Sequence, residues 1–241
     1  MKNGANTLIK SLTNASIDTC FTNPGTSEMH FVAALDQSSM RAVLCLFEGV
    51  ATGAADGYAR MANKPAATLL HLGCGLGNGI ANLHNARKAR VPMLNIIGDH
   101  ATYHKQYNAP LESDIETLAR NVSSWVRTTA TTNELKADTL EAIQVAQSDP
   151  QQISTLILPA DVSWGRVSEE QEVTSPASPL ATRLATREEL ETVAEILKRY
   201  GNKVAILLGR RVLLEDGLMA ASKISETTGA KLFCEVFPAR L

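Results

Sequence analysis

Residues 44–61, LCLFEGVATGAADGYARM, place one carboxylate, Glu48, between an apolar run and a helix of small residues. Leu44, Leu46 and Phe47 predict a buried strand before it. Desolvating a carboxylate is costly unless a cation or a proton donor meets it, and burial raises its proton affinity. Glu48 is therefore a candidate for holding or sharing a proton.

Three other strand ends carry unusual residues: NPGT (23–26), HLGCGLGN (71–78) and GDHATYH (98–104). Ligands bind at the carboxyl ends of strands in open α/β sheets. NPGT also fits an ordinary type II turn. His71 is either a satisfied core residue or a catalytic one. These alternatives stay open on the residues alone.

The glycines of GCGLGNG, residues 73–79, match neither a dinucleotide fingerprint nor a P-loop, so a Rossmann cofactor site is rejected there. We expect a glycine-rich loop that opens a helix through Arg87 and lets a flat or bulky group approach the backbone. His100 and His104 have helical spacing but no third ligand nearby, so no metal site is predicted. Cys20, Cys45, Cys74 and Cys234 form no CxxC pair, and reduced thiols are expected.

Composition excludes several classes. The 241 residues are 44% hydrophobic and carry a formal charge of −2, so neither nucleic acid nor an anionic membrane is the expected partner. The sequence contains neither an apolar run near the ~18 residues that span a membrane nor a secretory signal pattern. A cytoplasmic location is expected.

Short apolar runs alternate with helical patterns along the chain. The predicted strands are 17–21, 42–47, 66–72, 93–98 and 155–159, with helices between most of them. This alternation predicts an α/β fold, a parallel sheet with helices on both faces. A long polar segment containing Trp125 is left without assigned structure.

The amino-acid composition changes after residues 1–165, which are expected to form the first domain. Residues 166–185 are polar with prolines and predict a linker. Thr186 and Glu189 then form a capping-box pattern, followed by strand 203–209, a helix over 213–228 and strand 230–237. This βαβ unit cannot bury both faces of a sheet, so residues 186–241 are expected to be the incomplete start of a Rossmann-like domain.

Taken in order, NPGT, FEGVATGAADGYARM, KPAATLLHLGCGLGNGIANLHNA and TLILPADVSW resemble the pyrimidine-binding domain of thiamine diphosphate enzymes, of the acetolactate synthase and benzoylformate decarboxylase kind. The resemblance covers about residues 4–165, and the segment after 186 resembles the start of that family's central domain. It implies that Glu48 hydrogen-bonds N1′ of the cofactor aminopyrimidine, which activates C2 of the thiazolium towards a 2-oxo acid.

The resemblance also implies the other site residues. Asn23, Pro24, Gly25, Gly75 and Asn78 would contact the aminopyrimidine, His71 would transfer protons, and Thr26, His71 and His100 would face the substrate. Departures from acetolactate synthases are Gly73-Cys74-Gly75 for Gly-Pro-Gly, and Thr26.

The diphosphate and Mg²⁺ would be bound outside this chain, because the GDG…Asn motif is absent from it. The expected partner is therefore the diphosphate-binding domain of a second subunit in a homodimer or tetramer. The prediction is the N-terminal portion of a 2-oxo acid decarboxylase or carboligase, inactive alone. The alternatives are the pyrimidine-binding subunit of a split two-chain decarboxylase, or a non-catalytic α/β binding module.

Overall fold

The computed structural model describes residues 3–167 and 184–238 of the 241. The chain divides into two compact units, Met1–Leu180 and Ala181–Leu241, and each is described by itself. Most of the predicted linker, residues 168–183, lies outside the described residues. The assignment of the domains at 1–165 and 186–241 stays a prediction.

The first unit is built on one parallel sheet. Its strands lie in the order β2-β1-β3-β4-β6-β5. Their bounds are β1 Thr19–Asn23, β2 Arg41–Leu44, β3 Ala66–Leu70, β4 Met93–Asp99, β5 Trp125–Thr128 and β6 Ile153–Pro159. The near-continuous apolar runs of β3, β4 and β6 are buried at every position, as central strands covered on both faces must be.

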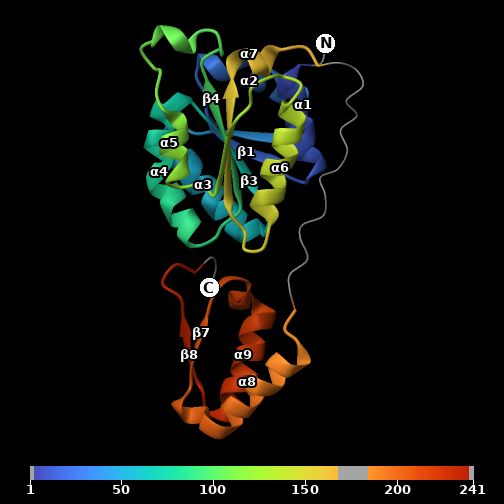
Figure 1. The fold of residues 1–241 in the computed structure, drawn as a ribbon, viewed down its shortest axis with the longest axis vertical. Coiled ribbons are helices and arrows are strands. Elements are labelled where there is room, and N and C mark those ends of the chain that lie inside the picture. Colours follow the sequence, from blue (N-terminus) through green and yellow to red (C-terminus); the bar gives the residue numbers. More distant parts are fainter. Residues whose placement is uncertain (1–2, 168–183, 239–241) are drawn as a thin grey trace. The chain divides into compact units, whose positions relative to one another are not determined.

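Helices cover both faces of this sheet (Figure 1). Their bounds are α1 Gly4–Asn14, α2 Met29–Leu35, α3 Glu48–Ala62, α4 Leu72–Lys88, α5 Ile115–Arg120, α6 Leu135–Gln147 and α7 Ala160–Trp164. On one face α1, α2 and α6 bury Leu8, Phe31 and Ile143. On the other, α3 and α4 bury Ala55 and Leu83. The predicted α/β fold with helices on both faces is confirmed.

The prediction of a buried strand over 42–47 is wrong in its burial. β2 ends at Leu44, and Leu44, Leu46 and Phe47 are exposed, Leu46 at 90% of its surface. Among the strands of the described residues β2 pairs only with β1, so it is an edge strand of the sheet. An apolar run predicts a strand but does not show whether that strand has a neighbouring strand on one side or on both. The sequence therefore could not distinguish an edge strand from a central one.

The helix predicted to open at the glycine-rich segment is present, and it includes the glycines that were expected to form a loop. α4 begins at Leu72, so Gly73, Cys74, Gly75 and Asn78 lie in its first two turns. Glycine in a helix costs up to about 1 kcal/mol each relative to alanine, so packing must offset the cost. Gly79 shows how: a Cβ there would lie 2.8 Å from the Thr52 side chain of α3.

Two elements arise in the segment left unassigned, namely α5 and the edge strand β5 with Trp125 at its start. α5 is only six residues long, and β5 has four. Elements this short carry too few periodic positions for a pattern to be read.

The chain reverses direction along the sheet between β1 and β3. β2 lies on one side of β1, and the chain returns to place β3 on the other side. Asn23 pairs with Leu70, so the residues after these two strands, Pro24-Gly25 and His71, emerge side by side. Such a switch point is where open α/β sheets bind ligands.

The second unit is a βαβ segment preceded by a helix. Its elements are α8 Arg187–Tyr200, β7 Ala205–Leu208, α9 Glu215–Thr228 and β8 Lys231–Cys234, with β7 and β8 parallel. The capping box is present, since the Thr186 side chain accepts from the Glu189 N–H and Glu189 accepts from the Thr186 N–H. The strand predicted at 203–209 forms as β7, and its burial in this two-stranded sheet is mixed, with Ala205 and Leu207 exposed, Ile206 half-buried and Leu208 buried.

No helix within the described ranges has the length and apolar character needed to cross a membrane.

Candidate functional site

Glu48 is the first residue of α3 and is buried, with 8% of its surface exposed. Asn78 of α4 donates from its side-chain amide to Glu48 Oε2 at 3.0 Å. The amino end of a helix stabilises a negative charge. Across 3–167 and 184–238 the carboxylate has no cationic partner. A buried carboxylate held by one amide has the capacity to bind a further donor.

His71 follows β3 and is the residue before α4. Its Nδ1 lies 2.8 Å from Oε2 of Glu28, a buried carboxylate at the end of the short helix Thr26–Glu28. The same oxygen accepts the Gly25 N–H at 2.7 Å. A Cβ on Gly25 would stand 2.4 Å from the His71 ring, so only glycine lets the turn lie against it. The NPGT turn and His71 therefore form one unit.

Gly75 joins this unit to Glu48. A Cβ on Gly75 would lie 3.1 Å from Glu48 Oε1 and 3.5 Å from His71 Cβ. The two side chains therefore flank the same point on the first turn of α4. Gly25, Glu48, His71, Gly75 and Asn78, all proposed from the sequence, come together at the switch point of the sheet.

The remaining predicted residues behave differently. Asn23 donates its side-chain amide to the Cys45 carbonyl at 2.7 Å, which ties the ends of β1 and β2 together. Pro24 precedes Gly25 in the turn, and Thr26 is exposed. The His100 ring lies near that of His104, with centroids 5.6 Å apart and the ring planes tilted by 57°. The ligand roles of all these residues stay predictions.

Glu28 was missed in the sequence, although its spacing was a usable signal. A carboxylate three residues after Gly25 can reach back to the backbone N–H at the start of a turn, as in a capping box. Here Glu28 does so and binds His71 as well. Burial raises the pKa of Glu28 above its ordinary 4.5, against the opposite effect of its hydrogen bonds with Gly25 and His71.

The turn into α4 is strained. Leu72, directly after His71, has φ 54°, a left-handed conformation that is unusual for a bulky residue. Such a residue costs about 1–3 kcal/mol and persists only where surrounding structure holds it. The Leu72 side chain is buried, and its packing provides that hold.

Asp99, the last residue of β4, is buried, with 1% of its surface exposed. Lys105 reaches it at 2.5 Å and also lies 3.2 Å from Glu112. Burial raises the pKa of Asp99, and the Lys105 ammonium partly offsets this. Burial alone would lower the pKa of Lys105, but its two carboxylate partners raise it.

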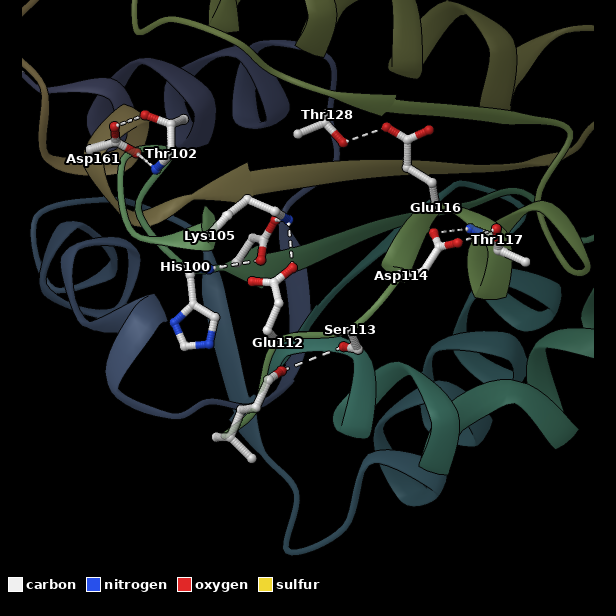
Figure 2. Close-up of polar contacts among 12 residues, drawn as sticks. His100, Thr102, Lys105, Glu112, Ser113, Asp114, Glu116, Thr117, Thr128 and Asp161 are labelled. Atoms are coloured by element: carbon white, nitrogen blue, oxygen red, sulfur yellow. Dashed lines mark hydrogen bonds and ion pairs between the residues drawn. The ribbon is translucent and has the colours of Figure 1, made fainter. Parts of the chain in front are cut away.

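Figure 2 shows this cluster, in which Lys105 points to Glu112. The backbone N–H of His100 donates to Oδ1 of Asp99. A pocket of about 420 Å³ opens here, with Asp99, Lys105, Glu112, Glu116 and Thr128 among its lining residues. Thr128 donates to Glu116 at 2.8 Å, joining α5 to β5. The pocket is predominantly acidic, and its only described lysine is already paired twice.

Four free thiols are present, with Cys20 and Cys45 buried and Cys74 and Cys234 exposed. Burial raises the pKa of Cys20 to about 12, so this thiol is unreactive. In the described ranges no three His, Cys, Asp or Glu side chains gather in a way that would hold a metal ion.

Comparison with known proteins identifies the domain. Residues 2–120 match the family described as "Thiamine pyrophosphate enzyme, N-terminal TPP binding domain". The chain is 54% identical, over 98% of its length, to a Mycobacterium tuberculosis protein provisionally named acetolactate synthase large subunit IlvX, covering 45% of that protein. It is 28% identical to benzoylformate decarboxylase of Pseudomonas aeruginosa over 79% of this chain and 36% of the relative.

Among solved structures, the thiamine diphosphate-dependent 4-hydroxybenzoylformate decarboxylase of Rhodococcus jostii RHA1 superposes with a TM-score of 0.83. It has 21% identity, and the match covers 98% of this chain and 45% of that one. At this identity the likeness shows the fold alone. The chain thus spans less than half the length of these relatives. Residues 2–120, which carry this site, thus match the N-terminal TPP binding domain of thiamine pyrophosphate enzymes, and the chain is similar to proteins named acetolactate synthase large subunit and benzoylformate decarboxylase.

Proposed function

We propose that this chain supplies the pyrimidine-binding half of the active site of a thiamine diphosphate-dependent enzyme that acts on a 2-oxo acid. The observation that carries the proposal is the buried Glu48 carboxylate at the start of α3, held by Asn78 and beside His71. The relatives bear the names of an acetolactate synthase subunit and a benzoylformate decarboxylase. Both names are consistent with a 2-oxo acid substrate.

The residues of the site fit the aminopyrimidine. Gly25 and Gly75 lack the Cβ atoms that would crowd His71 and Glu48, so backbone can approach a flat ring there. Glu48 would hold a proton at ring nitrogen N1′, and Asn78 keeps its carboxylate in place. A buried carboxylate with an amide partner is suited to sharing a proton with a ring nitrogen.

Thiamine diphosphate, when bound, supplies the carbon nucleophile and the electron sink for decarboxylation or carboligation. The protein would control the protons: Glu48 would hold the proton at N1′, and His71 would exchange a proton with the substrate. The diphosphate, with Mg²⁺, would be held by the diphosphate-binding domain of a second subunit. The exposed apolar residues around Glu48 support such a partner, since Leu46, Phe47 and Val50 all face solvent.

The test uses the protein at its native length, isolated with an antibody against residues 1–160 from cells that produce it. Release of CO₂ from pyruvate and from benzoylformate is measured with and without thiamine diphosphate and Mg²⁺. We expect cofactor-dependent release that falls at least about a hundredfold in Glu48→Gln. Cofactor-independent behaviour, or a Glu48→Gln variant as active as the wild type, would refute the proposal.

The matched control is Glu112→Gln. It removes a partly buried carboxylate that lies beside Lys105 and has no contact with Glu48 in the described structure. We expect it to retain cofactor dependence. This control separates the loss of a particular proton-holding group from the loss of any buried negative charge.

A further inference from the structure

Glu28 is an unusual buried carboxylate. Only 1% of its surface is exposed, and both of its described hydrogen bonds are made by one oxygen, Oε2. The other oxygen, Oε1, is buried without a hydrogen-bond partner within the described structure. It lies so close to Gly98 of β4 that a Cβ there would overlap it. A group placed only for stability would be expected to satisfy both oxygens.

The contacts of Oε2 determine what His71 can do. The Gly25 N–H can only donate, so Oε2 accepts at 2.7 Å, and a hydrogen bond to the carboxylate favours its ionised form, which has no proton to give to the ring. His71 then carries its proton on Nδ1, which donates to Oε2 across 2.8 Å. A neutral imidazole has one N–H, so Nε2 is left with a lone pair.

The surroundings of the ring leave Nε2 as its available nitrogen. Gly25 lies against Cε1 and Nδ1 on one side, and Gly75 packs near Cβ at the base of the side chain. Nε2 is not buried and has no hydrogen-bond partner in the described part of the chain. The charged groups around the ring are Glu28 and, across Gly75, Glu48.

We infer that Glu28 is a positioning residue: it fixes His71 in the Nδ1–H tautomer, directs Nε2 into the site beside Glu48, and provides the countercharge when Nε2 takes up a proton. The inference rests on the proposed function for the use made of Nε2. When Nε2 accepts a proton the imidazolium is paired with the Glu28 carboxylate, and when Nε2 donates it the ring returns to neutral. Nδ1 keeps its own proton throughout, so the exchange is balanced.

The first experiment needs no cofactor. The 241-residue chain is labelled with ¹⁵N-histidine, and two-bond ¹H–¹⁵N correlations report which ring nitrogen of His71 is protonated, with His71→Asn identifying the signal. We expect the Nδ1–H tautomer in the wild type and in Glu112→Gln. Glu28→Leu should shift the neutral ring to the Nε2–H tautomer that free histidine prefers. A wild-type ring in the Nε2–H tautomer would overturn the inference.

Glu28→Gln separates positioning from countercharge, because a glutamine oxygen can still accept from the Gly25 N–H and from Nδ1. We expect it to keep the tautomer and the fold. In the native-length enzyme kcat should fall about tenfold or more with little change in KM. If Glu28→Gln changes neither kcat nor the tautomer, the proposed role of Glu28 as the countercharge of protonated His71 is refuted.

The two proposals can fail separately. If the wild-type protein releases no CO₂ yet His71 shows the Nδ1–H tautomer, the proposed function fails and the assignment of Glu28 as the residue that fixes His71 stands. If CO₂ is released but the tautomer is wrong, the role of Glu28 fails alone.

Discussion

At the scale of single residues, the site depends on how closely backbone can approach two side chains. Gly75 faces Glu48 and His71, whereas nothing lies within 4 Å of a Cβ built on Gly77 two residues later. Both glycines belong to the first turns of α4, so their helix propensities are alike. The pair therefore isolates the effect of crowding from the effect of glycine itself.

Gly77→Ala should stabilise the chain by up to about 1 kcal/mol, the difference in helix propensity. Gly75→Ala should be less stable than Gly77→Ala by about 1–2 kcal/mol, because its Cβ would stand 3.1 Å from Glu48 Oε1. Urea unfolding of the two variants measures the difference. Equal stabilities would mean that Glu48 yields freely and that Gly75 does not shape the site.

Glu28 should also affect how stability changes with pH. Burial raises its pKa in the folded chain above the ordinary 4.5, so the folded state keeps a proton that the unfolded state has lost. Its contribution to stability is complete below pH 4.5 and is lost as pH rises through the folded pKa. We expect Glu28→Gln to remove this fall in urea titrations from pH 4 upwards.

Asp114 provides a control of opposite sign. Its pKa is lowered, first by the Thr117 hydroxyl and then by the Thr117 N–H, so its contribution is lost as pH falls rather than as it rises. Asp114→Asn should therefore alter only the acid end of the stability curve. A Glu28→Gln curve parallel to the wild type would show that burial does not perturb Glu28.

At the scale of elements, the segment between β4 and α5 is attached to the sheet by one lysine. Lys105 binds Asp99 at the end of β4 and Glu112 near the start of α5. Thr102 adds a second attachment, since its backbone N–H and hydroxyl donate to Asp161 of α7 (Figure 2). Removing the Lys105 ammonium would leave Asp99 buried without its cation.

Lys105→Met should cost about 2 kcal/mol, the penalty for leaving a buried acceptor unpaired, and should speed amide exchange over residues 100–113. Arg120→Met removes an exposed pair with Glu116 and should cost less than about 0.5 kcal/mol. Urea unfolding and hydrogen exchange measure both. Similar losses in the two variants would contradict a special role for the buried pair.

At the scale of the whole molecule, β2 and the start of α3 expose an apolar surface of Leu44, Leu46, Phe47 and Val50. These residues lie within four positions of the buried Glu48 in the chain, and contiguous exposed apolar surface commonly marks an interaction site. The predicted partner, a second subunit, would cover them. Met61 is also exposed, but it lies at the other end of the 15-residue α3.

Leu46→Asp should therefore weaken self-association of the protein at least tenfold in Kd, measured by sedimentation velocity over a range of concentrations, because it places a charge in a desolvated contact. Met61→Asp should leave association unchanged. Equal association of Leu46→Asp and the wild type would place the subunit contact elsewhere.

The sequence by itself determined the α/β class, the parallel strands, the capping box at Thr186 and the grouping of Gly25, Glu48, His71 and Asn78. The class, the strands and the capping box follow from local patterns, namely apolar periodicity and turn residues. The grouping follows from the rule that parallel strands end at one edge, together with the resemblance to thiamine diphosphate enzymes. Only the tertiary structure decided that Gly75 lies in a helix, that Leu46 is exposed, and that Glu28 and Asp99 are buried. Those outcomes depend on which strands become neighbours and which side chains meet across the sheet, and contacts between distant segments leave no periodic pattern in the chain.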